Sequence, residues 1–256
     1  MRFITAYESD IGIKKATNQD AILIKKAQTE LGEVLFAVIC DGMGGLEKGE
    51  VASREVIDRL AVWFHTELPQ MLWEGYTKSA LWKKWRDIVL EENQKIAAFG
   101  RKQNVSLGTT VTAFLAIEET YYVVHVGDSR IYELSDMLYQ ITEDQTLVAK
   151  EIAAGRLTEE QAEKDPRRSV LLQCVGASKI VEPVFYSGKI KENAVYMLCS
   201  DGLRHMCTPR EIWNSFCAEV NADERAMKSH IVELIELLKQ RQEKDNISCI
   251  LIKTLK

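Results

Sequence analysis

The sequence predicts an α+β fold in which sheets are covered by helices in layers. Three observations lead to this class. Short runs rich in β-branched and aromatic residues indicate strands, and three longer segments place apolar residues near the 3.6-residue period of a helix. The order of these segments is not a regular alternation of strand and helix, so a parallel sheet wound by helices is not expected.

The strand signals are short apolar runs. The run 34–40 is continuously apolar and long enough for a buried strand. The other predicted strands are Ala21–Ile24, Thr109–Ile117, Tyr121–Val126, Arg130–Leu134, Ala194–Cys199 and Ile247–Ile252.

Helical patterns separate the strands. They cover Glu50–Leu68, Trp82–Phe99 and Ala222–Leu238. We assign their aromatic residues and methionines to the core and give them no chemical role. A short polar insert with helical character lies before the final strand, helix and strand.

Composition limits the class of protein. The 256 residues suffice for one domain with a full core, and 46% hydrophobic with 28% charged residues is typical of globular chains. The net charge is −5 without a basic stripe, so nucleic-acid binding is not expected. No apolar run of about 18 residues indicates a membrane span, and the first residues do not resemble a signal peptide. We therefore expect a cytoplasmic protein without a membrane partner, whose six cysteines stay reduced.

Acidic residues mark the ends of five predicted strands. A carboxylate at the end of a buried strand is costly to desolvate without a cation or hydrogen-bond donors. A set of oxygen ligands without His or Cys suits magnesium, manganese or calcium. Asp-Gly is also a common turn, but five such ends together favour a shared metal site. The aspartates are Asp20, Asp41, Asp128, Asp201 and Asp245.

Three glycines follow the first of the central aspartates. Gly42, Gly44 and Gly45 match neither a dinucleotide-binding fingerprint nor a P-loop. We expect them to let the backbone approach an ion closely, so that the carbonyl of Gly42 can act as a ligand.

Eight segments, in order, resemble the PPM family of metal-dependent type 2C protein phosphatases, and its short bacterial members in particular. They cover nearly the whole chain. The segments are Gly12–Asp20, Cys40–Gly45, Gly108–Thr110, Val126–Arg130, Thr142–Asp144, Leu171–Gly176, Ser200–Gly202 and Asp245–Ser248.

The resemblance implies a four-layer α-β-β-α sandwich, formed by residues 1–256 as a single domain, with a flap insert at about 147–170. It implies two Mn²⁺ or Mg²⁺ ions at one end of the sandwich. Asp41 would bridge the ions, the carbonyl of Gly42 would bind one, and Asp201 and Asp245 would bind the other. Asp128 would correspond to a third, weaker metal site.

Two residues depart from the family pattern. Lys15 stands where the family usually has an arginine that contacts substrate phosphate, so the charge remains but the bidentate fork is lost. Gln19 stands where some relatives have a glutamate ligand, so one negative charge is missing and weaker metal affinity is expected. Met43 replaces a histidine of the animal members, and the general acid therefore stays unassigned.

These features predict a serine/threonine protein phosphatase. A water that bridges the two ions would become the nucleophile, and Lys15 would offset charge on the phosphate oxygens. Lys15 and Asp20 are the catalytic candidates, and His205 is a further candidate proton donor. Ser129 and Ser200 lack a histidine at a recognisable spacing, which makes a covalent mechanism unattractive.

Other readings of the sequence stay open. The chain could be a catalytically weak or inactive regulator that binds phosphoproteins, which Lys15 and Gln19 would favour. It could also act on small phosphorylated metabolites, although no dedicated pocket motif is present. For the main hypothesis, we expect a monomer that acts in signalling on phosphorylated proteins made by a serine/threonine kinase.

Overall fold

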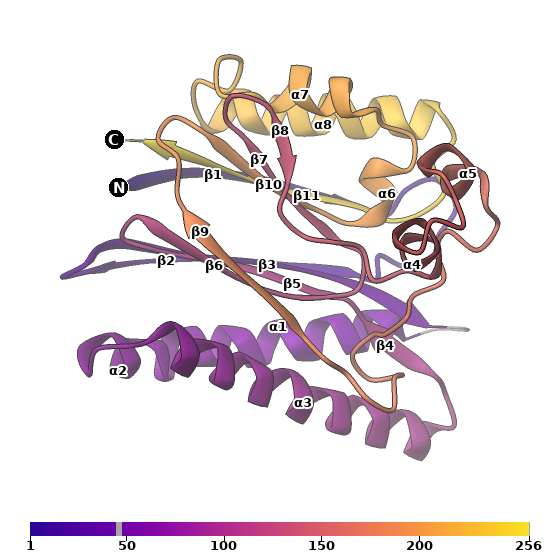
Figure 1. Ribbon diagram of the computed structural model, residues 1–256, viewed down its shortest axis with the longest axis horizontal. Helices are drawn as coiled ribbons and strands as arrows, with labels where there is room; N and C mark the ends of the chain where they lie inside the picture. The colour runs from indigo at the N-terminus through magenta and orange to yellow at the C-terminus, as the bar shows by residue number, and fades with distance from the viewer. Residues whose placement is uncertain (45–47, 256) are drawn as a thin grey trace.

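Two antiparallel sheets stack face to face, and helices cover the outer face of each, in this computed structural model (Figure 1). The structure describes residues 1–44 and 48–255, so Gly45, one of the three glycines considered above, lies outside the described residues. The layers run helix, sheet, sheet, helix, which confirms the predicted fold class.

The first sheet has the strand order β1-β11-β10-β7-β8, and the second has the order β2-β3-β5-β6-β9, with β4 paired to β3. The strands of the first sheet are β1 (Arg2–Asp10), β7 (Arg130–Leu134), β8 (Leu138–Gln140), β10 (Val195–Cys199) and β11 (Ile247–Leu255). Those of the second are β2 (Asp20–Thr29), β3 (Gly32–Gly44), β4 (Leu107–Thr109), β5 (Val111–Ile117), β6 (Thr120–Val126) and β9 (Val184–Lys189).

The helices divide between the two outer layers and the insert. The layer on the second sheet contains α1 (Gly49–Thr66), α2 (Leu68–Trp73) and α3 (Lys78–Gln103), and the layer on the first contains α7 (Pro209–Phe216) and α8 (Glu224–Gln240). The insert forms α4 (Leu147–Ala153) and α5 (Glu159–Lys164), and α6 (Asp201–Arg204) follows β10.

Three clusters of buried apolar side chains hold the four layers together. Each interface between layers is stabilised because apolar surface is removed from water there. Between the second sheet and its helices, Phe36, Trp63 and Trp85 are fully buried, and the two indole rings lie 5.6 Å apart. Between the sheets, the rings of Phe114 and Tyr196 lie 5.1 Å apart. The third cluster joins α7 and α8 to the first sheet.

Every predicted strand and all three long helices are present, with longer bounds than expected for β2 and β3. The sequence analysis missed β1, β8 and β9. Each lies at the edge of its sheet, and alternating or partial burial gives such strands no continuous apolar run. In β1, for example, Phe3 and Ala6 are buried while Arg2 and Tyr7 are exposed.

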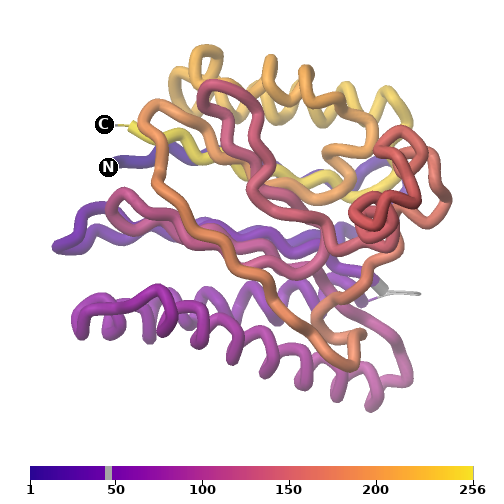
Figure 2. Tube along the Cα trace, in the orientation of Figure 1, coloured from indigo at the N-terminus to yellow at the C-terminus, as the bar shows by residue number. Residues whose placement is uncertain are grey.

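One end of the sandwich gathers segments that are far apart in the sequence. Figure 2 shows the chain between β1 and β2, the α6 segment and the insert at this end. Asn246, at the start of β11, donates from Nδ2 to the carbonyls of Ile11 and Thr17, at 2.9 and 3.2 Å. These bonds fix the β1–β2 loop against the first sheet.

Gly202 allows α6 to pack against the chain before β11. A Cβ atom at this position would lie 2.1 Å from the carbonyl oxygen of Asn246 and 3.4 Å from Cβ of Asp245. The first contact is with backbone, which cannot move aside without shifting the strand.

We predict that Gly202→Ala lowers the free energy of unfolding by about 3 kcal/mol, because overpacking against a fixed backbone forces a shift. Denaturant unfolding measures this. The matched control is Gly155→Ala, where no atom lies within 4 Å and φ is +69°. The control should cost only about 1 kcal/mol, from the left-handed backbone. Equal losses at the two positions would contradict the packing role of Gly202.

Candidate active site

Asp41 lies near the end of β3, directly opposite Asp20 on β2. Its backbone is fixed by the threonine pair that precedes β5. The N–H of Asp41 donates to Oγ1 of Thr110 at 2.9 Å, and its carbonyl accepts from the N–H of Thr110 at 2.9 Å and from Oγ1 of Thr109 at 3.0 Å. The Gly-Thr-Thr segment therefore orients the aspartate by hydrogen bonds.

The aspartates of the other sheet reach the same place. The ammonium of Lys15 lies 2.7 Å from Oδ1 of Asp245. Burial lowers the pKa of Lys15, but the bond to Asp245 and the negative charges of Asp41 and Asp201 raise it overall above its usual value. Of these three predicted metal ligands, Asp245 therefore contacts the ammonium directly, and Asp41 and Asp201 lie close enough to act on its charge.

Crowding of the carboxylates changes their protonation. Burial raises the pKa of Asp41 well above its usual range, and the charges of Asp20, Asp201, Asp128 and Asp245 raise it further. Burial likewise raises the pKa of Asp20 to about 7, and Asp201 and Asp245 add to the effect. In the absence of ions, the site thus opposes the accumulation of negative charge.

The donor set fits hard divalent ions. Oδ1 of Asp20 and Oδ1 of Asp201 are buried without a hydrogen-bond partner in the described residues, a costly state that a cation would relieve. Gly42 also fits, because a Cβ there would lie 2.3 Å from the carbonyl oxygen of Gly49. Within 1–44 and 48–255, no three His, Cys, Asp or Glu side chains already enclose a common point, so binding requires the carboxylates to turn.

Hydrogen bonds hold Asp20 in place. Its Oδ2 accepts from Oγ of Ser200 at 2.8 Å, and Oγ of Ser200 accepts from the N–H of Ser248 at 3.0 Å. The N–H of Asp20 donates to Oδ1 of Asn18 at 3.1 Å, and Nδ2 of Asn18 donates to Oγ of Ser9 at 2.8 Å. This chain of hydrogen bonds joins β2 of one sheet to β1 and β11 of the other, and to Ser200, which follows β10.

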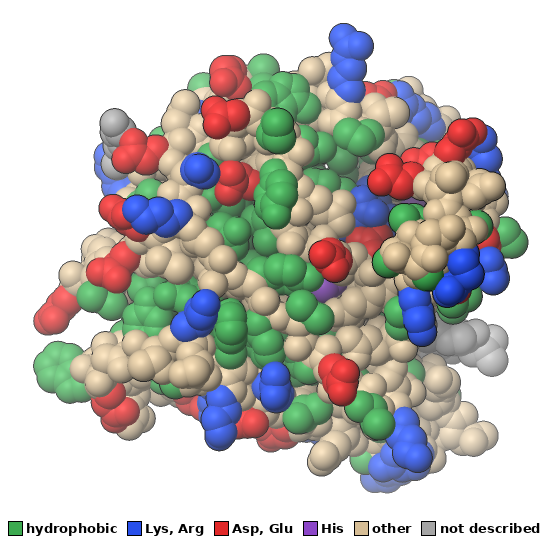
Figure 3. All heavy atoms as spheres, in the orientation of Figure 1, with side chains coloured by type: hydrophobic (Ala, Val, Ile, Leu, Met, Phe, Trp, Pro, Cys, Tyr) green, Lys and Arg blue, Asp and Glu red, His purple; other side chains and the backbone are tan. Residues whose placement is uncertain are grey.

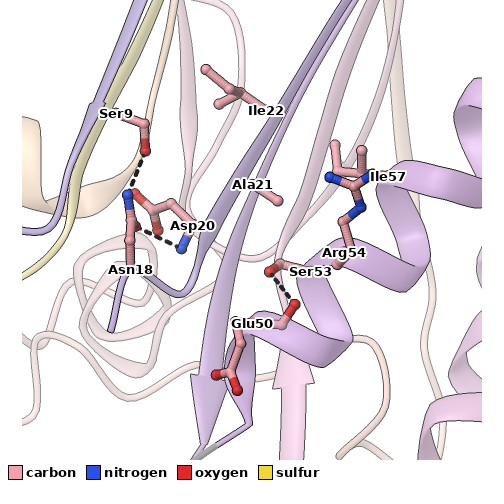
Figure 4. A pocket seen from close by; sticks show the side chains of 9 residues that line it. All are labelled: Ser9, Asn18, Asp20, Ala21, Ile22, Glu50, Ser53, Arg54 and Ile57. Atoms are coloured by element: carbon pink, nitrogen blue, oxygen red, sulfur yellow. Dashed lines mark hydrogen bonds between the residues drawn. The ribbon is translucent and has the colours of Figure 1, made fainter. Parts of the chain in front are cut away.

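A hollow of about 460 Å³ lies beside Asp20. Figure 4 shows Asn18 and Asp20 on one wall, and Glu50, Ser53 and Arg54 of α1 on the other. Asp20 therefore borders an opening on the α1 side of the site.

Gln19 contacts the backbone of the glycine segment. When its amide is oriented to satisfy both neighbours, the nitrogen donates to the carbonyl of Gly42 and the oxygen accepts from the N–H of Gly49, each at 3.2 Å. The N–H of Gln19 itself donates to Oδ1 of Asn246 at 2.9 Å. Gln19 thus lies against the carbonyl predicted to bind an ion.

Asp128 has a cationic partner that the sequence analysis missed. Nη2 of Arg204 lies 2.9 Å from Oδ2 of Asp128 and 3.4 Å from Oδ2 of Asp144, which itself binds Arg130 through two bonds of 2.7 and 2.8 Å. Burial and the charge of Asp201 nevertheless raise the pKa of Asp128 to about 7. A third ion at Asp128 would compete with the guanidinium.

His205 lies between two carboxylates at the end of α6. Its Nε2 is 3.3 Å from Oδ2 of Asp201, and its Nδ1 is 3.6 Å from Oε2 of Glu243. Burial lowers its pKa, but Glu243 and Asp201 outweigh this and raise it above the usual value. His205 thus borders the carboxylate cluster, and its role as a proton donor stays a prediction. His125, by contrast, is buried and bonded to Thr112, away from any such role.

Comparisons with known proteins agree with the geometry. A family model described as Protein phosphatase 2C matches residues 13–252. Protein phosphatase PhpP of Streptococcus pneumoniae serotype 2 is 31% identical over 208 residues, 80% of each chain. Serine/threonine protein phosphatase PstP of Mycobacterium tuberculosis is 33% identical over 248 residues, which are 96% of this chain and 44% of PstP.

Solved structures give the same result. The Mycobacterium tuberculosis serine/threonine phosphatase PstP/Ppp has a TM-score of 0.82 at 31% identity, with 99% of each chain covered. Serine/threonine phosphatase Stp1 from Staphylococcus aureus has a TM-score of 0.85 at 26% identity, with 100% of this chain and 96% of Stp1 covered. From the matched family model and these relatives, the chain belongs to the protein phosphatase 2C family.

Proposed function

We propose that this protein is a metal-dependent phosphatase that hydrolyses phosphoserine and phosphothreonine on other proteins. The observation that carries the proposal is the gathering of carboxylates at one end of the sandwich. Asp20 lies opposite Asp41, and Oδ1 of Asp20 and Oδ1 of Asp201 are buried without a hydrogen-bond partner in the described residues. Membership of the protein phosphatase 2C family supports the same activity.

We further propose that two Mn²⁺ or Mg²⁺ ions bind here. Asp41 and the carbonyl of Gly42 would hold one ion, with Asp41 shared, and Asp201 and Asp245 would hold the other. The catalytic domain of PstP has been solved with two manganese ions, at a TM-score of 0.78 to this chain. When bound, such ions supply an activated water and neutralise charge on the phosphate.

The chain's own residues prepare this chemistry. Lys15 would exchange its bond to Asp245 for the phosphate oxygens, where a positive charge lowers the energy of the transition state. Oδ2 of Asp20 accepts a hydrogen bond from Ser200, whereas Oδ1 of Asp20 has no hydrogen-bond partner in the described residues. We propose that this oxygen positions the attacking water. His205 is the proposed proton donor to the leaving group.

Three broader proposals accompany the activity. Residues 1–256 form one catalytic domain, with the insert 147–170 beside the site. The substrates are proteins phosphorylated by a serine/threonine kinase, and the enzyme acts as a monomer in cytoplasmic signalling. None of the helices in the described ranges combines the length and apolarity needed to cross a membrane.

We predict that Asp201→Asn abolishes metal-dependent turnover. Loss of an ion ligand removes several kcal/mol of stabilisation, so release of phosphate from a phosphothreonine peptide should fall on the order of a hundredfold or more. Wild type should require Mn²⁺ or Mg²⁺ and stop with chelator. The control Asp136→Asn, at an exposed turn, should keep full activity. Absence of wild-type turnover with either ion in folded protein would contradict the proposed function.

We predict that the metal-free protein, kept in chelator, loses stability as pH rises from about 6.5 to 8. Asp20 and Asp128 have folded pKa values of about 7, above their unfolded values, so their protonated forms stabilise at low pH and this contribution disappears as pH rises. The two groups together should contribute on the order of 1 to 2 kcal/mol over this range. Thermal or urea unfolding in chelator measures it. Saturating Mn²⁺ should remove the loss, and a flat profile of the metal-free protein would contradict the raised pKa values of Asp20 and Asp128.

We predict that Gln19→Glu makes the site more dependent on metal. A carboxylate cannot donate to the carbonyl of Gly42, so the metal-free protein should lose about 1 kcal/mol of stability. The added charge should tighten Mn²⁺ binding by about tenfold in calorimetric titration. The control Gln103→Glu adds the same charge at the end of α3 and should leave the Mn²⁺ affinity unchanged. Unchanged Mn²⁺ affinity in Gln19→Glu would remove Gln19 from the site.

A further inference from the structure

A second hollow, of about 530 Å³, opens on the insert side of the carboxylate cluster. Four segments line it: residues 14–16 of the β1–β2 loop, residues 168–169 of the insert, residues 205–206 after α6, and residues 242–245 before β11. These segments are far apart in the sequence, and the fold brings them together. The hollow shares Lys15 and Asp245 with the active site, so it continues directly from the place where the phosphate would bind.

The hollow carries uncompensated positive charge. Lys14, Arg168 and Lys244 are exposed, and none has an acidic partner within 4.0 Å in the described part of the chain. Its two acidic residues are already engaged: Asp245 lies 2.7 Å from the ammonium of Lys15, and Glu243 lies 3.6 Å from Nδ1 of His205. The lining therefore presents three available cations beside the cluster.

A neighbouring arginine shows that not every basic residue of the insert is available to a ligand. Arg167 binds Asp165 through Nε and Nη2, at 3.0 and 2.8 Å, whereas the adjacent Arg168 lines the hollow without such a partner. Figure 3 shows both basic and acidic side chains over the insert, on the side of the molecule where α4 lies, and Arg156 and Lys164 there are paired with Glu151 and Glu160. An anionic chain that enters the hollow would therefore meet the unpaired cations of its lining, Lys14, Arg168 and Lys244, rather than the paired ones of the insert.

The dimensions suit a few residues of a polypeptide. The volume lies within the range of about 300–1,000 Å³ that is common for ligand sites. An extended chain advances about 3.3 Å per residue, so side chains close to the phosphorylated residue would reach the hollow while the phosphate lies at Lys15. Small phosphoesters would leave the hollow empty.

We propose that Lys14, Arg168 and Lys244 form an anion-selecting subsite for the substrate. It favours phosphoproteins that carry a second anionic group, an acidic side chain or another phosphate, within a few residues of the phosphate that is removed. This inference rests on the proposed function for its substrate class. The three residues touch the flanking chain and take no part in the chemical step.

The test compares wild type with the triple variant Lys14→Gln, Arg168→Gln, Lys244→Gln. Four phosphothreonine peptides of equal length carry alanines, two glutamates, a second phosphothreonine, or two lysines beside the reacting residue. Binding is measured by fluorescence anisotropy, which needs no turnover, and kcat/KM is measured with Mn²⁺. The control variant Arg101→Gln, Lys179→Gln, Lys191→Gln removes the same charge outside the hollow.

Wild type should bind and cleave the anionic peptides about five- to tenfold better than the alanine peptide, because several partly exposed charge pairs each contribute modestly. The triple variant should lose this preference, while the control variant keeps it. Turnover of p-nitrophenyl phosphate, which is too small to reach the hollow, should be equal in all three proteins. The relative response to the glutamate and doubly phosphorylated peptides identifies which anion the subsite takes.

Equal binding of all four peptides to wild type, or an unchanged preference in the triple variant, would overturn the subsite. Failure of the proposed function looks different. In that case p-nitrophenyl phosphate and every peptide would resist hydrolysis, while anisotropy would still report whether anionic peptides bind through Lys14, Arg168 and Lys244.

Discussion

Burial of several carboxylates together at one end of the sandwich is the constraint on which the rest of the structure depends. Asp20, Asp41, Asp128, Asp201 and Asp245 affect one another through low-dielectric surroundings. Protein cations offset part of this charge: Lys15 at Asp245 and Arg204 at Asp128. The remaining negative charge is reduced by protonation in the metal-free protein and, in our proposal, is balanced by divalent ions in the active enzyme. The same charge that destabilises the metal-free fold therefore provides the affinity for metal.

Hydrogen bonds within and between the two sheets keep these groups together despite their charge. Thr110 fixes the backbone of Asp41, Ser200 holds the carboxylate of Asp20, and Asn246 anchors the loop that carries Lys15. Each bond joins segments that are distant in the sequence. The three apolar clusters supply the folding free energy that lets the strands end in this charged region.

Most of the fold, and the position of aspartates at strand ends, could be predicted because both follow from local patterns. A buried strand is an apolar run, and an aspartate that ends such a run is visible without a structure. The edge strands β1, β8 and β9 could not be found in this way, because burial on one face leaves no continuous run. The pairing of Arg204 with Asp128 also depends on tertiary contact, since the two lie on different elements. Likewise, the contact of Gln19 with the carbonyl of Gly42 follows from the packing of β3 and α1 against the loop. The roles assigned to the site residues stay predictions.

The most direct test of the central claim is the stoichiometry of Mn²⁺ binding to the folded protein. It is measured as the loss of the free-ion signal in electron paramagnetic resonance. Our account predicts two tightly bound ions per chain in wild type and fewer in the variant Asp245→Asn, which should keep the fold but lacks one ligand charge. Binding of no ion by wild type, or equal binding by wild type and Asp245→Asn, would contradict the claim that the carboxylate cluster exists to hold metal.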